Sequence, residues 1–319
     1  MDPAMTVVDV DSHVYEPAAI WEDYLGRDER PLARAAFWHE IDAGGLETTI
    51  LNGRPVRALE RSGIPRRACW RPGMTPQSIG ALDPEAPHAV SPGAVDPAAR
   101  LRDMDAMGID RALLFPTLFA EHFPLIENPD AARVLARAYN DWLLDFATAS
   151  ARRLLPVAIL PLQSVSFAVT ELERVAERGC KAAFIRPSFF QGRFPSHPSY
   201  KPLWKRLEEL GVAGAAWVPL ALEKAETYLW LFSGIRDVSL EPERVFFARP
   251  SLVAFDSWEH AVGRMPDVFE RVAAWGSRYP NHDTGTVEEA RAMLGRHGVA
   301  AETVGSFLGG NAIRHFGLG

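Results

Sequence analysis

Short apolar runs alternate with longer helical patterns along most of this chain, and this alternation limits the fold more than any other feature. Runs such as 7–10 and 111–116 have the apolar, β-branched or aromatic content of buried parallel strands. Segments such as 97–107 and 128–150 have helical patterns. Strands that alternate with helices form β-α units on a parallel sheet, so the sequence predicts an α/β fold.

The later elements follow the same alternation. We expect strands at 155–160, 181–186, 212–218, 244–255 and 273–277. We expect helices at 165–178, 199–210, 222–233, 264–272, 287–296 and 302–316. Residues 18–96 break the pattern, because they are rich in Pro, Gly and Arg. We therefore expect an irregular insertion or lid after the first strand.

The size and charge of the chain exclude several classes of protein. Its 319 residues, 47% of them hydrophobic, can form one α/β barrel or two ordinary domains, and we expect a single domain over 5–319 preceded by a short addition at 1–4. A net charge of −7 without a basic run argues against nucleic acid as a partner. Small-molecule substrates are the partners we expect.

The cysteine count and the apolar runs bear on the compartment. Cys69 and Cys180 are the only cysteines, too few for a disulfide framework or a thiolate metal site, which is typical of a reducing cytoplasm. No apolar run approaches the roughly 20 residues of a membrane span, and the start of the chain lacks the pattern of a secretion signal. We therefore expect a cytoplasmic protein without a membrane partner.

Polar side chains cluster where the first strand ends. Asp11 and His13 are two residues apart, so on an extended strand they point the same way, and Glu16 can fold back from the loop. Carboxylate and imidazole together suit a hard or borderline divalent metal. A second interpretation is a polar strand end whose side chains cap the backbone.

Six motifs follow one another along nearly the whole chain, at 9–17, 138–146, 155–161, 179–187, 275–283 and 307–317. Together they resemble the amidohydrolase-related family, in its amidohydrolase 2 branch, whose members include metal-dependent hydrolases and non-oxidative decarboxylases. The resemblance implies a TIM-like (β/α)8 barrel with its site at the C-terminal ends of the strands. Residues 219–243 have room for about one helix and a loop, so one β-α unit could be missing or rebuilt.

The resemblance also implies where a metal would bind. The family's paired ligands after strand one fall on Asp11 and His13, with Glu16 on a neighbouring acidic position. The histidine after strand five falls at Trp217, and the aspartate after strand eight falls at Arg278. A divalent metal such as Zn, Mn or Fe could be retained through Asp11, His13 and Glu16, with His282 or Asp283 as a further ligand. Because Trp217 and Arg278 replace expected ligands, no cofactor is the expectation.

Replacing an aspartate by arginine changes what the site can bind. Arg278 presents a planar fork suited to a carboxylate or phosphate of a substrate. Alternatively, it could form an ion pair with Asp11 or Glu16 and fill the metal position with a guanidinium. Trp217 could stack on an aromatic ligand or simply fill the cavity.

Acid–base chemistry remains available without a metal. His13 can act as a general base, because imidazole titrates near neutral pH, and Asp11 can fix its tautomer. His282 with Asp283 is a second candidate acid–base pair. Further candidates for contact with a substrate are Arg186, Tyr15 and Tyr279, the two tyrosines also as proton donors.

Two functional hypotheses follow. The first is an enzyme that acts on a small aromatic or carboxylated metabolite by hydrolysis, decarboxylation, dehydration or cyclisation, without the standard mononuclear metal. The second is a catalytically reduced partner subunit of a hetero-oligomeric enzyme of the family. A missing β-α unit would expose an apolar edge, so we expect a homo-oligomer or a hetero-oligomer with a related barrel subunit.

Overall fold

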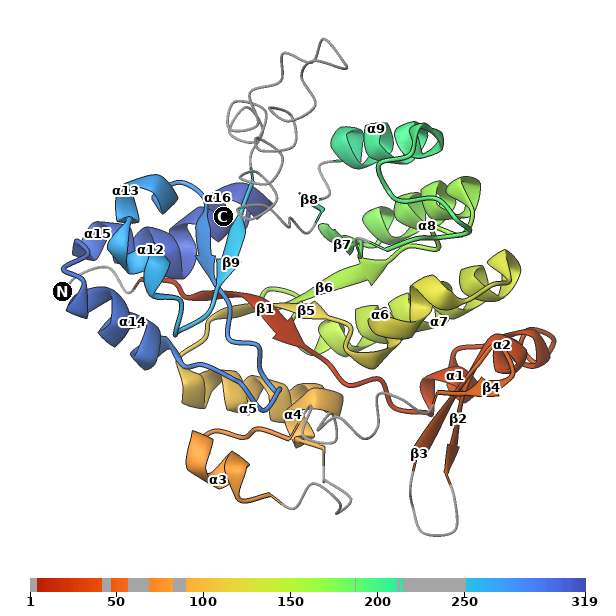
Figure 1. Ribbon diagram of the computed structural model, residues 1–319, viewed down its shortest axis with the longest axis horizontal. Helices are drawn as coiled ribbons and strands as arrows, with labels where there is room; N and C mark the ends of the chain where they lie inside the picture. Colours follow the sequence, from red (N-terminus) through yellow and green to blue (C-terminus); the bar gives the residue numbers. More distant parts are fainter. Residues whose placement is uncertain are drawn as a thin grey trace, which may run out of the picture. The chain divides into compact units, whose positions relative to one another are not determined.

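The computed structural model describes residues 5–41, 47–56, 69–82, 90–186, 188–210, 213–214 and 251–319 (Figure 1). The chain divides into two compact units. The larger unit consists of Asp11–Gly214 and Arg278–Thr284. The smaller unit consists of Met1–Val10, Ala215–Ser277 and Gly285–Gly319.

A five-stranded sheet confirms the predicted α/β class. Its strands lie in the order β1-β5-β6-β7-β8, and the pairs from β5 to β8 are parallel. The strands are β1 (Val8–His13), β5 (Arg111–Phe115), β6 (Leu154–Ile159), β7 (Ala182–Phe184) and β8 (Ala213–Gly214). β5 and β6 carry buried Leu, Val and Ala side chains, as expected for strands covered by helices.

The long helices of the larger unit lie close to their predicted positions. They are α5 (Pro97–Met107), α7 (Pro129–Ala147), α8 (Val165–Glu177) and α9 (Lys201–Leu210). α5 begins at Pro97 because the Asp96 carboxylate accepts a hydrogen bond from the amide of Ala99 at 2.6 Å. Shorter turns connect them, namely α6 (Leu118–His122), η2 (Phe123–Leu125), η3 (Thr148–Ser150) and η4 (Pro198–Tyr200).

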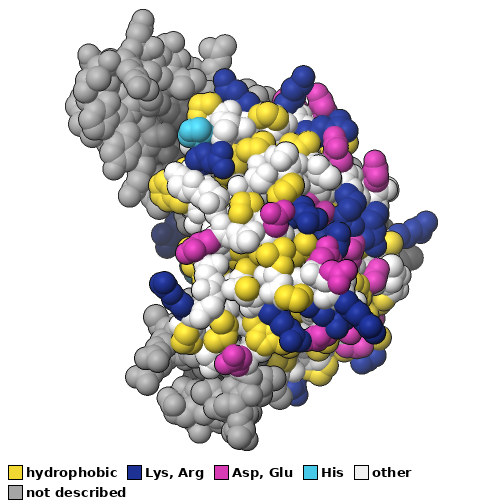
Figure 2. All heavy atoms as spheres, turned by 90° about the vertical axis from the view of Figure 1, so that its right-hand side faces the viewer, with side chains coloured by type: hydrophobic (Ala, Val, Ile, Leu, Met, Phe, Trp, Pro, Cys, Tyr) yellow, Lys and Arg dark blue, Asp and Glu magenta, His cyan; other side chains and the backbone are white. Residues whose placement is uncertain are grey.

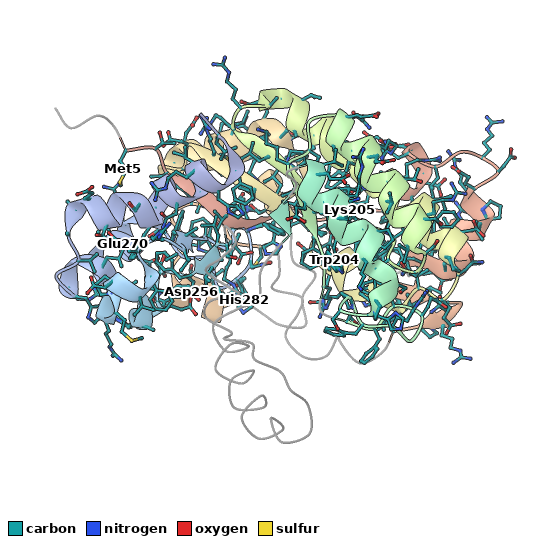
Figure 3. The ribbon with its side chains drawn as sticks, turned by 90° about the horizontal axis from the view of Figure 1, so that it is seen from above. Met5, Trp204, Lys205, Asp256, Glu270 and His282 are labelled. Atoms are coloured by element: carbon teal, nitrogen blue, oxygen red, sulfur yellow. The ribbon has the colours of Figure 1, made fainter. Side chains whose placement is uncertain are left out.

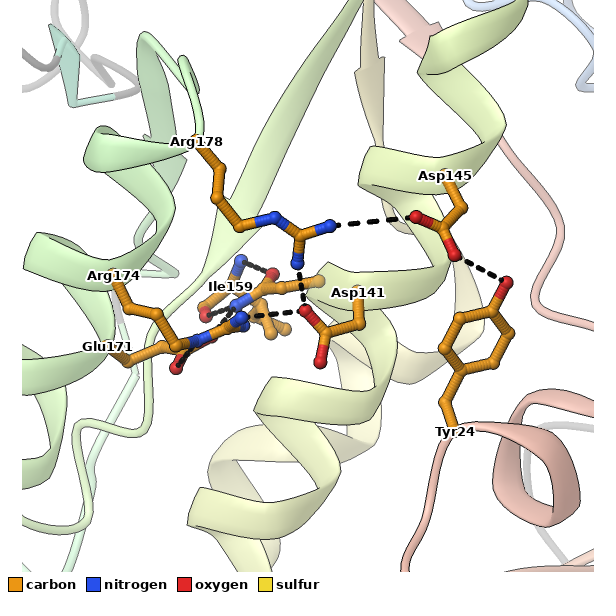
Figure 4. A network of polar contacts seen from close by, with 8 residues as sticks. Tyr24, Asp141, Asp145, Ile159, Glu171, Arg174 and Arg178 are labelled. Atoms are coloured by element: carbon orange, nitrogen blue, oxygen red, sulfur yellow. Dashed lines mark hydrogen bonds and ion pairs between the residues drawn. The ribbon is translucent and has the colours of Figure 1, made fainter.

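An ion-pair network joins α7 to α8 (Figure 4). Arg174 donates to both carboxylate oxygens of Glu171, at 2.8 and 2.7 Å, and to Asp141 at 2.6 Å. Asn140 donates to Glu171 at 2.6 Å and to the carbonyl of Ile159 in β6 at 2.9 Å. Basic and acidic side chains also lie side by side on the face shown in Figure 2.

The described residues of the expected insertion at 18–96 are not irregular but contain helices and strands. They form α1 (Ile20–Asp23), α2 (Arg30–Ala36), β2 (Phe37–Ile41), β3 (Glu47–Leu51), β4 (Arg54–Pro55), α3 (Pro76–Gly80) and α4 (Pro92–Val95). β2, β3 and β4 make an antiparallel sheet. Its tight turn uses Asn52 and Gly53, both at positive φ, which is a hairpin signal that the Pro- and Gly-rich surroundings obscured.

The smaller unit contains two parallel strands, β9 (Val253–Phe255) and β10 (Ala273–Trp275). The helix predicted at 264–272 is instead two short helices, α12 (His260–Arg264) and α13 (Pro266–Phe269), because Pro266 cannot continue the first one. α14 (Val287–Arg296) matches its prediction and begins with a capping box of Thr286 and Glu289.

The predicted terminal helix is made of three pieces. α15 (Ala301–Gly305) and α16 (Asn311–Phe316) flank a π-helical turn at Ser306–Gly310. A Cβ on Gly309 would lie 1.9 Å from the carbonyl oxygen of Thr6, so only glycine fits there. The predicted helix 222–233, most of the predicted strands 212–218 and 244–255, and the interval 219–243 lie outside the described residues. None of the described helices is long and apolar enough to cross a membrane.

Candidate active site

The backbone brings the end of β1 next to the segment 278–281. The amide of Arg278 donates to the carbonyl of Asp11 at 2.8 Å, and the amide of His13 donates to the carbonyl of Tyr279 at 2.6 Å. The amide of Val14 donates to the carbonyl of Phe115, the last residue of β5, at 3.0 Å. Residues more than 260 positions apart in the sequence therefore meet at the C-terminal end of this strand.

Asp11 and His13 form an ion pair at this strand end. His13 Nε2 lies 3.2 Å from Asp11 Oδ1, while its Nδ1 lies 3.1 Å from the carbonyl of Pro116. Because a carbonyl can only accept, Nδ1 carries a hydrogen and Nε2 is the nitrogen that gains or loses the proton beside the carboxylate. The side chains are 21% and 33% exposed, so a ligand can reach both.

The two groups shift each other's pKa. Burial alone would lower the pKa of His13, but the hydrogen bond and charge of Asp11 outweigh it and raise that pKa. Burial alone would raise the pKa of Asp11, but the hydrogen bond and charge of His13, with a contribution from Arg278, lower it. Both shifts favour a protonated imidazole beside an ionised carboxylate.

Arg278 is held in an unusual backbone conformation with only part of its guanidinium bonded. Its φ is 61°, in the left-handed region. Nη2 forms an ion pair with Asp283 Oδ2 at 3.0 Å. The partner is therefore Asp283, whereas the sequence had suggested Asp11 or Glu16. Arg278 Nε, Asp283 Oδ1 and Asn281 Oδ1 are buried atoms without a hydrogen-bond partner in the described structure. A donor and two acceptors are thus left for a ligand.

Glu16 bonds to the backbone of the neighbouring loop. It is buried, and its Oε1 accepts from the amide of Thr117 at 2.6 Å. Burial raises its pKa, against the effect of these amide hydrogen bonds. Within the described ranges, no group of three or more His, Cys, Asp or Glu side chains could hold a metal ion. Among the residues that the structure describes, Asp11 and His13 therefore offer two candidate ligands.

The other sequence candidates are dispersed. Tyr279 is buried and donates its hydroxyl to Asp103, and burial raises its pKa, so it is a poor proton donor. His282, which is labelled in Figure 3, is exposed, whereas the Asp283 carboxylate forms its ion pair with Arg278.

Three candidates remain to be placed. The amide of Tyr15 donates to the carbonyl of Ala94 at 3.0 Å, which fixes the loop after β1. Arg186 lies near enough to His122 for its positive charge to lower the pKa of that imidazole, after the larger effect of burial. Trp217 lies outside the described residues.

Sequence reasoning missed Arg100, which is fully buried directly behind His13. Its guanidinium donates to the carbonyl of His13 and, at 2.8 Å, to Ser12 Oγ. A signal was present, because Arg100 shares the buried face of α5 with Met104 and Met107 at helical spacing. An arginine on an otherwise apolar stripe must have internal partners.

Aromatic side chains line the strand ends beside this pair. The ring of Phe115 lies 6.1 Å from the imidazole of His13 and 6.2 Å from the ring of Phe184. The pair at the end of β1 therefore has an apolar flank on β5 and β7, which suits a flat aromatic ligand.

Comparisons with known proteins identify a related sequence and several related structures. A γ-resorcylate decarboxylase from Rhizobium radiobacter is 35% identical over 120 residues, which are 35% of this chain and 36% of the relative. The match thus spans about a third of the relative's length.

Solved structures show the fold. An amidohydrolase from Mycobacterium avium subsp. paratuberculosis K-10 has a TM-score of 0.74 at 17% identity, covering 99% of this chain and 100% of that one. A 5-carboxyvanillate decarboxylase from Novosphingobium aromaticivorans, complexed with manganese and 4-hydroxy-3-methoxy-5-nitrobenzoic acid, has a TM-score of 0.63 at 19% identity, covering 98% of this chain and 96% of that one.

These similarities over nearly the whole chain confirm the expected barrel-type α/β fold. The family model for the amidohydrolases matches residues 9–237, which include the whole of the Asp11–His13 motif. The chain therefore belongs to the amidohydrolase family.

Proposed function

We propose that this chain is a lyase that removes the carboxylate of a small aromatic acid without oxidation, with His13 as the proton donor. The Asp11–His13 ion pair at 3.2 Å is the observation that carries the proposal. Loss of CO2 from an aromatic ring requires a proton at the carbon that held the carboxylate. An imidazole whose pKa is raised by a carboxylate, against the effect of burial, is suited to supply it.

The step balances without an oxidant or reductant. The imidazolium of His13 transfers its Nε2 proton to the ring carbon that carries the carboxylate. The bond between that carbon and the carboxylate then breaks, its electron pair returns to the ring, and CO2 leaves. His13 ends neutral and regains a proton from solvent. A ring hydroxyl next to the reacting carbon would stabilise the positive charge that develops on the ring.

Arg278 is the residue that we assign to the substrate's carboxylate. Its guanidinium is a permanent cation, and its buried Nε is a donor without a partner among the described residues. Asp283 holds the other edge of the guanidinium at 3.0 Å, so the group is oriented before a ligand arrives. Phe115 and Phe184 provide the apolar side that an aromatic ring requires.

We further propose that this chemistry does not use the family's standard mononuclear metal. The related decarboxylase from Novosphingobium aromaticivorans is complexed with manganese, and a divalent metal bound here would supply positive charge next to the substrate. Asp11 and His13 are the residues that would hold it. The described residues do not complete such a site, and Arg278 stands where the family resemblance implies a ligand carboxylate. The steps above therefore use the guanidinium alone.

The test is turnover of γ-resorcylate, the acid named in the related decarboxylase, followed by chromatography of the product and by release of CO2. We expect a His13→Asn variant to lose about 10³-fold in kcat, the size of effect that a general acid supplies. His197→Asn is the matched control, because His197 lies on an exposed loop and bonds only locally to Ser199.

Two outcomes would contradict the assignment. Equal turnover in the His13 variant would remove the proton donor, and no turnover of any aromatic carboxylate by the pure chain would contradict the activity. In the second case, activity on adding a related barrel subunit would favour the partner-subunit hypothesis.

Metal content tests the metal-free part separately. We would measure it by inductively coupled plasma mass spectrometry on untagged protein and on an Arg278→Asp, Trp217→His double variant. Metal in the double variant alone would agree with the proposal, since both substitutions restore ligand types that the family resemblance implies. Near-stoichiometric metal in the unmodified chain would contradict it.

A further inference from the structure

A polar cluster, buried except for the half-buried Asp103, lies directly behind the Asp11–His13 pair. It consists of Ser12, Arg100, Asp103 and Tyr279, and we refer to it as the Arg100 cluster. Arg100 donates from Nε to the carbonyl of Gly93 at 2.6 Å, from Nη1 to Ser12 Oγ at 2.8 Å, and from Nη2 to the carbonyl of His13. All three edges of a fully buried guanidinium are therefore used, two of them on the strand end that carries the catalytic pair.

Tyr279 completes the cluster from the other side. Its ring lies under the guanidinium of Arg100, with 4.5 Å between the Arg100 carbon and the ring centroid. Its hydroxyl donates to Asp103 and lies 3.2 Å from Ser91 Oγ. Its carbonyl accepts from the amide of His13 at 2.6 Å and from Ser12 Oγ at 3.4 Å. Tyr279 directly follows Arg278 in the chain, so the cluster fixes both halves of the candidate site.

The cluster is packed without spare room. A Cβ built on Gly93 would lie 2.3 Å from the Tyr279 hydroxyl and 2.5 Å from Asp103 Oδ2. The edge of the Trp70 ring also meets the Tyr279 ring, at 5.9 Å between centroids. Such a site has one arrangement, because any movement of the tyrosine breaks a hydrogen bond in a buried environment.

We propose that Arg100 and Asp103 are positioning residues that hold His13 and Arg278 in one fixed relation across the active site. Both residues stand on α5, one turn apart, so a single rigid helix holds the strand end through Arg100 and the 278–281 segment through Asp103. Neither residue reaches the substrate. The inference rests on the proposed function, since it names what orients the proton donor relative to the group that binds the carboxylate.

Kinetics separate this role from a general contribution to stability. Displacing a catalytic group by about 1 Å can cost about 10²-fold in rate. We expect two variants to lower kcat by at least about tenfold. Tyr279→Phe keeps the ring but loses the hydrogen bond to Asp103, and Arg100→Lys cannot reach three acceptors in one plane. The KM for γ-resorcylate should change by less than about threefold, because Arg278 retains its guanidinium.

A spectroscopic signature tests the same point without turnover. The imidazole nitrogen chemical shifts of His13 report its hydrogen bonds to Asp11 and Pro116, and they should change in Tyr279→Phe and Arg100→Lys. Arg102→Met is the matched control on the same helix, because Arg102 is exposed, and it should leave kcat and these shifts as they are. Unchanged shifts and unchanged kcat in folded Arg100 and Tyr279 variants would overturn the inference.

Two safeguards keep the test decisive. If Arg100→Lys does not fold, Tyr279→Phe and Asp103→Leu carry the comparison, since each removes the hydrogen bond between Tyr279 and Asp103 and leaves the three hydrogen bonds of the Arg100 guanidinium in place. If the unmodified chain does not turn over γ-resorcylate, the proposed function fails, yet the imidazole shifts still report whether the cluster positions His13. Shifts that respond without turnover would support positioning alone, and shifts that do not respond would overturn it.

Discussion

Two arginines of the larger unit differ in how completely their guanidinium groups are bonded. Arg174 on α8 uses Nε and both terminal nitrogens on Glu171 and Asp141. Arg278 pairs through one terminal nitrogen with Asp283, and its buried Nε has no partner in the described structure. A fully bonded arginine holds elements together, whereas a partly bonded one keeps a donor for something else. This difference distinguishes an arginine that stabilises the fold from an arginine that can bind a ligand.

The surroundings of the two arginines agree with that division. The partners of Arg174 include Glu171, which is also bonded to Asn140, so every member of the network has a neighbour on α7 or α8. The hydrogen bond to Glu171 is the largest cause that raises the pKa of Arg174. Arg278 sits at positive φ, a conformation that a non-glycine residue keeps only where the surroundings enforce it. Strain of this kind is common at functional sites.

The largest difference should appear in turnover of the aromatic acid. Arg278→Met should lower kcat/KM for γ-resorcylate by about 10²-fold, because a charged hydrogen bond to the carboxylate is lost. The free energy of unfolding should change by less than about 1 kcal/mol, since the side chain has one exposed ion pair to lose. Kinetics and urea unfolding on the same preparation measure both. A drop in stability with unchanged kinetics would reverse the comparison.

The second arginine should show the opposite result. Arg174→Met should lower the free energy of unfolding by about 2 kcal/mol, because it leaves the buried Glu171 carboxylate with fewer partners. Turnover should match the unmodified chain, since the contacts of Arg174 join α8 to α7. Urea unfolding followed by circular dichroism measures the stability. A loss of kcat in the folded variant would contradict a purely structural network.

The sequence predicts the regular part of the fold better than the insertion. α5 and α14 lie where they are expected, because their first turns carry strong start signals at Asp96 and Thr286. The β3–β4 hairpin was missed although Asn52 and Gly53 mark its turn. Its strands are short, and the Pro- and Gly-rich stretches around them have no period from which a sheet could be inferred.

The candidate site divides in the same way. The spacing of Asp11 and His13 predicts that they share a strand end, and the family resemblance placed Arg278 with them. The bonds of the Arg100 cluster could not be predicted, because they join residues 87 and 176 positions apart. Such contacts depend on how α5 packs in three dimensions. The local sequence pattern indicates only that a charged residue lies on the buried face of α5.

A smaller effect should appear in the pH dependence of turnover. The positive charge of Arg278 lowers the pKa of His13. This effect is smaller than that of burial, which also lowers the pKa, and smaller than that of Asp11, which raises it. Arg278→Met should therefore raise that pKa, so the alkaline decline in kcat, where His13 loses its proton, moves to higher pH. Arg174→Met should leave the decline in place. A shift to lower pH in the Arg278 variant would contradict the assignment of His13 as the proton donor.

The smallest effect is expected at a third arginine, which shows what a surface ion pair contributes. Arg206 on α9 donates to Glu173 at 2.7 Å, a distance as short as those of Arg174, and to Glu209 at 3.1 Å. Its partners, however, are 42% and 46% exposed, so water competes for both carboxylates. Arg206→Met should leave the urea midpoint and the turnover of γ-resorcylate within error of the unmodified chain. A destabilisation equal to that of Arg174→Met would show that the number of contacts, and not the burial of the partner, separates structural arginines from the rest.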